Sequence, residues 1–295
     1  MNRSISGSST RSLGGSNRRP VSELTDRRTV VSRLRALGIR PSKRRGQNFL
    51  VDRDVLARIV SEVERAEPET VVEIGPGLGT VTRRLAELGV RVIGVEVDHR
   101  LVAGLRQEFA GTENVEIVEE DFLRFDFGAL GSKKVYVVGN LPYRITSPIL
   151  ARLIEERARI SGAVLLTQAE VAEKIAESPG PHGSALGVFV QAYGEVIPLR
   201  HVPRTAFYPV PAVDSVLWRL EFLSTPRFTA APDDFFAIVR ALYGKRRKML
   251  RRVLRDFLPP DRIDPLLQQL GIDPTRRGET LTIPELDRLA SALFG

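Results

Sequence analysis

Short apolar segments alternate with helical patterns through the middle of this chain. The apolar segments have the length and composition of strands, and they lie at Thr70–Ile74, Arg91–Glu96, Val115–Val118, Lys134–Val138, Ala163–Thr167 and Ser215–Leu220. Between them, apolar residues recur every three or four positions, which predicts helices over segments such as Val55–Glu64, Val81–Leu88 and Ile149–Glu156. This alternation predicts an α/β fold in which helices cover both faces of a parallel sheet.

The two ends of the chain differ in character from the middle. Residues 1–21 are rich in Ser, Gly and Arg and offer little to bury, so we expect a disordered basic arm. A helical pattern begins near Ser22 and opens a domain that we assign to residues 22–225. Residues 226–295 are predicted to form a smaller all-helical domain. Its helical patterns lie at Pro232–Phe257, Asp261–Leu270 and Ile283–Leu293.

The composition excludes several kinds of chemistry. The 295 residues include no cysteine, which excludes disulfides, cysteine-ligated zinc, iron–sulfur clusters and a cysteine nucleophile. No apolar segment approaches the roughly 18 residues of a membrane span, and the N-terminus lacks the apolar region of a secretory signal. The three histidines, His99, His182 and His201, show no metal-ligand spacing. We therefore expect a cytoplasmic protein with no bound metal and no membrane contact.

Positive charge is concentrated near the N-terminus. Residues 1–45 carry 12 Lys and Arg residues against 2 Asp and Glu residues, whereas the rest of the chain carries 32 against 34. A basic arm on a near-neutral body is typical of proteins that bind nucleic acid through its phosphates. A solvated tail without a partner is the alternative.

A glycine-rich turn, Gly75-Pro76-Gly77-Leu78-Gly79, connects a predicted strand to a predicted helix. Gly75 and Gly77 let a ligand approach the backbone closely, beside the N–H groups of a helix N-terminus. Glu96 ends the next strand, 21 residues after Gly75, where a carboxylate can accept two hydrogen bonds from ribose hydroxyls. A dinucleotide fingerprint would need glycine at Thr80, so the pattern favours an adenosyl–amino-acid cofactor. A purely structural turn is the alternative for the glycines alone.

Asp121 and Phe122 follow the third strand. The Asp121 carboxylate is placed to accept a hydrogen bond from the adenine amine of such a cofactor, and the Phe122 backbone N–H to meet the ring. The alternative is a helix cap, because Asp before an apolar residue commonly caps a helix.

A second motif, Asn140-Leu141-Pro142-Tyr143, follows the fourth strand and suits a flat amine substrate. An exocyclic amine is a poor nucleophile, because its lone pair is delocalised into the ring. The Asn140 side-chain oxygen and the Leu141 carbonyl can accept its N–H groups, while Pro142 fixes the turn without a competing N–H. Tyr143 offers a face for stacking the base. The alternative is a proline turn with a packed tyrosine.

The segment Pro203–Pro211 contains three prolines and is predicted to be a loop. Within it, Phe207 is either a second stacking wall for the base or a core residue. A base inside a duplex must leave the stack to enter such a pocket, which is why a second wall is attractive. Trp218 lies within an apolar strand and is expected in the core.

The predicted helix Pro232–Phe257 carries a run of cations with no acidic residue between them. Its members that we expect to bind RNA are Lys245, Arg246, Arg247, Lys248 and Arg251, and we add Arg44 and Arg45 from the loop before the first strand. Apolar residues keep roughly helical spacing along the same segment, so one face can pack while the other meets phosphates. A hairpin would be recognised largely by shape and backbone. A solvated face is the alternative.

From about residue 30 onward the chain resembles the ribosomal RNA adenine dimethyltransferases of the KsgA type. The matching motifs are Gly46-Gln47-Asn48-Phe49-Leu50, Glu73–Gly79, Glu96-Val97-Asp98, Asp121 and Asn140–Tyr143. The resemblance implies a Rossmann-like S-adenosylmethionine methyltransferase sheet with a C-terminal helical domain. It places cofactor contacts at Asn48, Leu50, Gly75, Glu96, Asp121 and Asn140, and catalytic residues at Asn140–Tyr143, with Phe207 nearby.

Macrolide-resistance (Erm-type) methyltransferases share the catalytic motifs, and three features favour the KsgA type. These are Leu141 in the second motif, the segment Phe207–Ser215, and the C-terminal patterns at residues 245–251 and 277–281. Three departures flank the catalytic face: Arg144, Ala169 and the loop Pro181–Gly187, which matches the family pattern only loosely.

The resemblance implies dimethylation of two adjacent adenosines at N6, in a hairpin loop near the 3′ end of 16S rRNA. The expected partner is a small ribosomal subunit or its precursor, and we expect a monomer. Two alternatives are an Erm-type enzyme acting on 23S rRNA and a mainly non-catalytic ribosome-assembly or nucleic-acid-binding factor.

Overall fold

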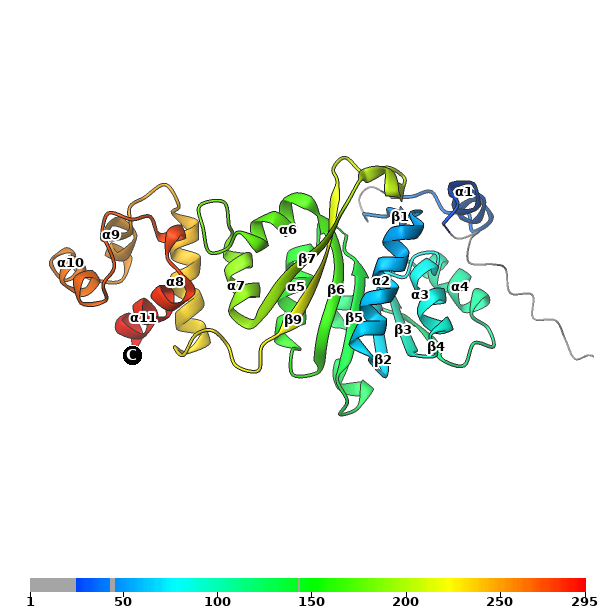
Figure 1. Cartoon of the computed structure of the whole chain (residues 1–295), viewed down its shortest axis with the longest axis horizontal. Helices are drawn as coiled ribbons and strands as arrows, with labels where there is room; N and C mark the ends of the chain where they lie inside the picture. The colour runs from blue at the N-terminus through cyan, green and yellow to red at the C-terminus, as the bar shows by residue number, and fades with distance from the viewer. Residues whose placement is uncertain (1–24, 43–45, 143) are drawn as a thin grey trace, which may run out of the picture.

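The computed structural model describes residues 25–42, 46–142 and 144–295. The predicted arm over residues 1–21 and three expected functional residues, Arg44, Arg45 and Tyr143, lie outside the described residues. Figure 1 shows the sheet in the middle of the molecule, the C-terminal helices at one end and the first helix at the other.

The central sheet has seven strands in the order β4-β3-β2-β5-β6-β9-β7, and a separate two-stranded sheet joins β1 to β8. The strands are β1 Phe49–Leu50, β2 Thr70–Ile74, β3 Arg91–Glu96, β4 Val115–Glu119, β5 Val135–Asn140, β6 Ile160–Gln168, β7 Gly194–Val202, β8 Phe207–Tyr208 and β9 Ser215–Phe222. The strands from β4 to β6 are parallel, and β9 runs antiparallel to both of its neighbours, β6 and β7. The predicted α/β class is confirmed, and the six predicted strands are all present.

The sheet differs from the prediction at one edge. β7 was not predicted, and its sequence explains why: it contains Pro198 and is only half-buried. Proline cannot donate to a ladder and is tolerated at sheet edges, where β7 lies. The pairing of β7 with β9 is irregular between Pro198 and Arg200, which fits that rule.

Helices cover both faces of the sheet, as the alternation predicted. The helices are α1 Arg27–Ala36, α2 Arg53–Ala66, α3 Thr80–Glu87, α4 His99–Glu108, α5 Thr146–Glu155, α6 Ala169–Ala176, α7 Ala185–Tyr193, α8 Pro232–Gly244, α9 Leu250–Val253, α10 Pro260–Gln269 and α11 Ile283–Phe294. One hydrophobic cluster joins α2 and α3 to sheet residues such as Val71, and another joins α5 and α7 to residues such as Val72. Neighbouring residues of a strand therefore bury opposite faces. Trp218 is fully buried in the second cluster, as expected.

The helix α1 packs beside the glycine turn. Val30 and Leu34 share a small apolar cluster with Leu78 of that turn. The Arg33 guanidinium donates to the Leu78 carbonyl at 3.5 Å and forms an ion pair with Glu108 at the end of α4. The N-terminal helix therefore supports the turn from outside the sheet.

The predicted helix Pro232–Phe257 is broken in the structure. α8 ends at Gly244, a turn spans residues 245–248, and a short helix, α9, begins at Leu250. Met249 forms a β-bridge with Arg277, and the Leu250 N–H donates to the Arg276 carbonyl at 2.8 Å. These backbone bonds to a distant segment replace those that would have continued the helix. The cations of this segment therefore lie on a turn instead of along one helix.

The C-terminal helices share a core with the sheet domain. Phe236 of α8 lies 4.7 Å, ring to ring, from Phe189 of α7, and Phe228 lies 5.3 Å from Tyr193. The hydrophobic cluster that fills one face of the sheet continues without interruption into α8 and α11. Across the described residues, no helix is both long enough and apolar enough to span a membrane.

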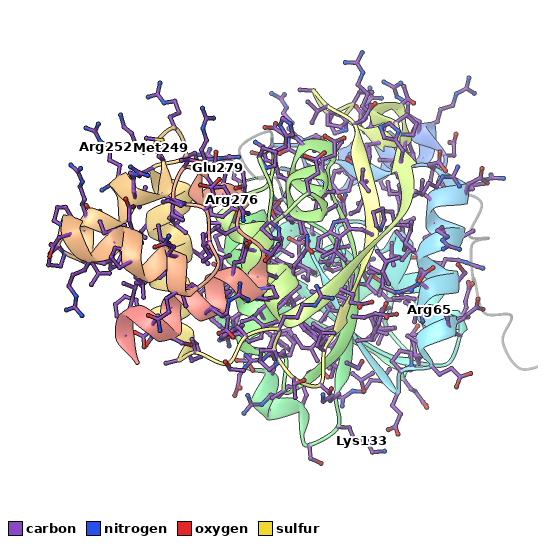
Figure 2. The ribbon with its side chains drawn as sticks, turned by 60° about the vertical axis from the view of Figure 1, so that its left-hand side comes forward. Arg65, Lys133, Met249, Arg252, Arg276 and Glu279 are labelled. Carbon is purple, nitrogen blue, oxygen red and sulfur yellow. The ribbon has the colours of Figure 1, made fainter. Side chains whose placement is uncertain are left out.

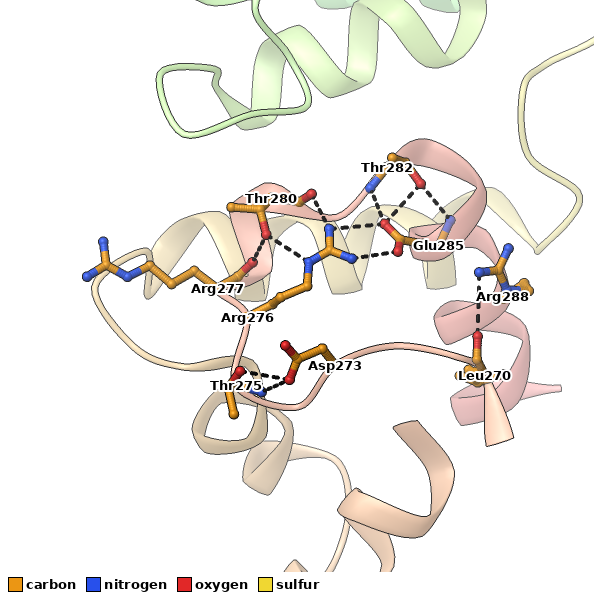
Figure 3. A network of polar contacts seen from close by, with 9 residues as sticks. All are labelled: Leu270, Asp273, Thr275, Arg276, Arg277, Thr280, Thr282, Glu285 and Arg288. Atoms are coloured by element: carbon orange, nitrogen blue, oxygen red, sulfur yellow. Dashed lines mark hydrogen bonds and ion pairs between the residues drawn. The ribbon is translucent and has the colours of Figure 1, made fainter. Parts of the chain in front are cut away.

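A polar network holds the start of α11 (Figure 3). Glu285 accepts two bonds from the Arg276 guanidinium, at 2.6 and 3.2 Å, and one from the Thr282 N–H at 2.7 Å. The Thr282 hydroxyl caps the helix through the Glu285 N–H, which completes a capping box.

We predict that Glu285→Ala lowers the free energy of unfolding by about 1–3 kcal/mol, because it removes the capping box and leaves the Arg276 guanidinium without its carboxylate. Urea unfolding at neutral pH would measure the loss. Arg288→Ala on the exposed side of the same helix is the control and should stay within about 0.5 kcal/mol of wild type. Equal unfolding midpoints for the two variants would contradict the prediction.

Candidate active site

The carboxyl ends of four parallel strands meet at one pocket. It encloses about 1130 Å³, part of it open to solvent, and takes its walls from the ends of β2, β3, β4 and β5. Ligands in open α/β sheets bind at this edge. The predicted residues that line the pocket are Asn48, Leu50, Gly75, Gly77, Glu96, Asp121, Phe122, Asn140 and Pro142. Residues from five separate motifs of the sequence thus come together.

The glycine turn forms one wall of the pocket. Gly75 and Gly77 have φ values of 63° and 61°, a backbone conformation that costs other residues energy. A Cβ at Gly77 would lie 3.2 Å from the Phe49 ring, whereas a Cβ at Gly75 would meet nothing within 4 Å. Gly77 is therefore needed for packing against β1, and the space in front of Gly75 is open to a ligand.

Glu96 binds the backbone of the site more fully than the sequence suggested. One carboxylate oxygen accepts the Gly77 N–H at 3.2 Å, and the other accepts the N–H groups of Val97 and Asp98, each at 3.0 Å. Burial raises the pKa of Glu96, while these N–H groups act against that rise. Three of roughly four acceptor positions on the carboxylate are used. About one remains for a ribose hydroxyl, where the sequence led us to expect two.

Asp98 links Glu96 to the segment that precedes β1. Its carboxylate caps α4, pairs with the Arg100 guanidinium at 3.1 Å and accepts the Gln47 side-chain amide at 3.2 Å. Burial acts to raise the pKa of Asp98, but the bonds from Arg100 and Gln47 outweigh it and hold that pKa at about 2. Asp98 therefore fixes residue 47 next to the pocket.

Glu73 is a pocket residue that the sequence analysis did not single out. It lies in β2, is 4% exposed and accepts the Thr82 hydroxyl at 2.6 Å. Burial, with a smaller contribution from the Glu96 charge, raises its pKa to about 7. A carboxylate inside the apolar segment Thr70–Ile74 was the signal that could have revealed it.

Asp121 caps a helix, as one interpretation of its position predicted, and it also lies at the pocket. One carboxylate oxygen accepts the Leu123 N–H at 3.0 Å and caps a short 3₁₀ helix, Phe122–Arg124. The residue is exposed and also lines the pocket. The Phe122 side chain is buried in the core, so only its backbone is placed to meet a ligand.

Asn140 ends β5 and faces the same pocket. Its side-chain nitrogen donates to the Asn48 carbonyl at 2.9 Å, which leaves the side-chain oxygen as an acceptor. The Leu141 side chain is buried and its N–H donates to the Leu166 carbonyl at 2.9 Å, so any contact with a substrate must come from its own carbonyl. Ile145, which lines the pocket and is 36% exposed, was not predicted.

Phe207 is not a second stacking wall. It is 2% exposed, belongs to the core cluster under α2 and does not line the pocket. Its strand, β8, pairs with β1 so that Phe207 lies opposite Leu50. The core interpretation is the correct one, and Phe207 acts by holding β1 against the pocket.

The cations of the turn 245–248 do not all face solvent. Arg247 and Lys248 are exposed, and they line a hollow together with Arg252 and Arg255. Lys245 forms an ion pair with Asp256, and Arg251 lies 3.8 Å from Asp264. Arg246 instead donates to a backbone carbonyl of the sheet domain. Within the described part of the chain, no group of three or more His, Asp and Glu side chains is arranged to hold a metal.

The chain is similar to rRNA-modifying proteins over most of its length. A sequence profile described as ribosomal RNA adenine dimethylase matches residues 40–292. Ribosomal RNA small subunit methyltransferase A of Moorella thermoacetica is 41% identical over 277 residues, which cover 90% of this chain and 96% of that protein. The protein of the same name from Bacillus mycoides is 41% identical over 265 residues, which cover 84% and 90%.

Two solved structures resemble the whole fold. The 23S rRNA methyltransferase ErmE has a TM-score of 0.68 at 30% identity, and the match covers 84% of this chain and all of that one, 100%. A dimethyladenosine transferase from Plasmodium falciparum has a TM-score of 0.69 at 24% identity and covers 81% and 95%. The second similarity shows the fold alone.

The raised pKa of Glu73 predicts a pH dependence of stability. A carboxyl with a pKa of about 7 in the folded protein and 4.5 as its ordinary value holds its proton more tightly when folded. The stability that this carboxyl contributes to the folded protein is fully present below pH 4.5 and is lost as pH rises through 7. Relative to Glu73→Gln, wild type should lose up to about 3 kcal/mol of unfolding free energy over that interval.

Denaturant unfolding at several pH values would measure this difference. Exposed Glu64 supplies the control, because Glu64→Gln should follow the wild-type curve. Parallel curves for wild type and Glu73→Gln across the interval would contradict the buried, protonated state of Glu73.

Proposed function

The chain belongs to the ribosomal RNA adenine dimethylase family, and we propose that it acts on two adjacent adenosines in a hairpin loop near the 3′ end of 16S rRNA. It is an S-adenosylmethionine-dependent methyltransferase of rRNA adenines, and the product is N6,N6-dimethyladenosine. The observation that carries the proposal is the oriented Asn140 amide, which lies in the same pocket as Glu96.

The residues of the pocket fit the cofactor. The open space at Gly75 suits a ligand that approaches the backbone closely, and the remaining acceptor position on Glu96 suits a ribose hydroxyl. Asp121 has a second carboxylate oxygen for the adenine amine. Leu50 and Asn48 close the pocket from the β1 side. S-adenosylmethionine supplies a methyl group that is activated by its bond to positive sulfur.

On the substrate side, we assign the acceptor role to Asn140 and Leu141. The Asn140 oxygen and the Leu141 carbonyl accept the N–H groups of the adenine N6 amine and orient its lone pair toward the methyl group. With S-adenosylmethionine bound, its methyl group would pass from sulfur to this nitrogen, S-adenosylhomocysteine would leave, and the proton of the amine would go to solvent. Positioning and electrostatics supply most of the rate, so no strong general base is needed. We assign the stacking role to Tyr143 alone, since Phe207 is buried.

We assign RNA binding to basic side chains of the C-terminal segment. Arg247, Lys248 and Arg252 surround an open hollow at the surface, and Arg44 and Arg45 precede the pocket in the chain. Phosphate contacts of this kind position a nucleic acid without reading its sequence. We propose that the substrate is a small ribosomal subunit or its precursor, found in the cytoplasm, and that the enzyme acts as a monomer without a metal.

Two alternatives are less well supported. An Erm-type activity on 23S rRNA rests on the similarity to ErmE at 30% identity, whereas the small-subunit methyltransferases reach 41%. A purely non-catalytic assembly factor would have no need of an oriented Asn140 and an open pocket beside Gly75.

Methyl transfer from labelled S-adenosylmethionine tests the proposal. Small subunits that lack the modification serve as substrate, with large subunits in parallel, and the labelled base is mapped. We expect two adjacent dimethylated adenosines in 16S rRNA and no label in 23S rRNA. Label in 23S rRNA would favour the Erm-type activity, and tight cofactor binding without label would favour the assembly factor.

A further inference from the structure

The loop between α6 and α7 contacts the basic turn of the C-terminal segment. The Arg246 guanidinium donates to the Pro181 carbonyl at 2.5 Å and lies 5.7 Å from the centre of the Tyr243 ring. The Tyr243 hydroxyl donates to the Glu279 carbonyl at 3.3 Å, which holds the ring in place. The loop is therefore held at Pro181 by Arg246, and Arg246 lies beside the Tyr243 ring at the end of α8.

The loop itself is tightly built. The Ser178 hydroxyl donates to the Lys174 carbonyl at 2.6 Å and accepts the Ser184 N–H at 2.8 Å, so it ties the loop to the end of α6. A Cβ at Gly187 would lie 2.1 Å from that hydroxyl oxygen, which shows how closely the backbone approaches Ser178. Prolines on both sides of Gly180 restrict the backbone further.

The loop is connected through α6 to β6, the strand that pairs with the strand carrying Asn140. α6 begins at Ala169, immediately after β6 ends at Gln168. β6 pairs with β5 so that Leu166 lies opposite Asn140. A short, well-packed path therefore joins the basic turn to the substrate side of the pocket.

The basic turn and the pocket also face the same end of the molecule. Figure 2 shows Met249 and Arg252 at its upper end and Lys133, which precedes β5, at its lower end. Because β5 runs from Lys133 toward Asn140, the carboxyl ends of the parallel strands lie toward the upper end. RNA held at the turn would thus lie on the same side as the pocket.

Arg246 differs in this setting from its neighbour Arg247. Both arginines line the same hollow, but Arg247 is exposed, whereas Arg246 is half-buried and its guanidinium donates to the loop. An arginine already engaged with a protein carbonyl and an aromatic ring is poorly placed to neutralise a phosphate.

We propose that Arg246 and Tyr243 form a latch on the loop 178–184 that sets the position of the basic turn relative to Asn140. Arg246 is then a positioning residue for methyl transfer, whereas Arg247 and Lys248 bind phosphates of the RNA backbone. This inference rests on the proposed function.

Salt dependence separates the two arginines. A phosphate contact releases counterions, so its loss reduces the slope of log affinity against log salt by roughly 0.7–0.9. Arg247→Ala should show that reduction. Arg246→Ala should keep the wild-type slope, but its rate at saturation should fall about tenfold or more because the target base is misplaced.

Tyr243→Phe provides a second variant that changes no charge. It removes the hydroxyl that bonds to the Glu279 carbonyl and so loosens the ring beside which Arg246 lies, so it should also lower the rate at saturation without changing the salt slope. The effects of Arg246→Ala and Tyr243→Phe should not add, because both variants open the same latch. All measurements use the full chain, S-adenosylmethionine and small subunits that lack the methyl groups, after thermal unfolding has shown that each variant is folded.

Two results would overturn the latch. One is a reduced salt slope with an unchanged rate for Arg246→Ala, which would make Arg246 a phosphate ligand. The other is an unchanged rate for both Arg246→Ala and Tyr243→Phe, which would make the contact simple packing. If Arg246→Ala does not fold, the rate of Tyr243→Phe decides. Failure of wild type to methylate the subunits would instead refute the proposed function, and with it the premise of the latch.

Discussion

The hydrogen bond from the Asn140 amide to the Asn48 carbonyl is the contact on which the site depends. It joins the end of β5 to the segment before β1, two parts of the chain that are far apart in sequence. On one side of this contact the pocket suits an adenosyl cofactor, and on the other it suits a flat amine. Because the nitrogen of the amide is bonded to Asn48, the oxygen remains as an acceptor on a residue that lines the pocket.

Support for this contact comes from several layers of the fold. β8 pairs with β1 and buries Phe207 behind it, and Asp98 holds Gln47 from the start of α4. α1 packs on the glycine turn through Arg33 and its apolar face. The cofactor wall is thus fixed from three directions, which suits an enzyme whose rate depends mainly on positioning.

Much of this arrangement could be predicted from the sequence. The six strands and the residues at their carboxyl ends were found because strand length, glycine turns and strand-end carboxylates are local signals. The predictions that were wrong concern residues whose surroundings depend on contacts between distant segments. Phe207 lies in a proline-rich segment, and its burial depends on the pairing of β8 with β1. The predicted helix Pro232–Phe257 is broken after α8 because Met249 and Leu250 bond to residues 276–277. β7 was hidden by Pro198, and the pKa of Glu73 depends on burial that no short motif reveals.

Single-turnover methyl transfer by Asn140→Asp at saturating S-adenosylmethionine tests the central claim most directly. Asp keeps an acceptor oxygen for the amine, but at pH 8 it has no N–H to donate to the Asn48 carbonyl. Our account predicts a loss of about 100-fold or more, close to that of Asn140→Ala, because the oriented contact is gone in both. An Asn140→Asp enzyme within about threefold of wild type would contradict the account, since the acceptor alone would then suffice.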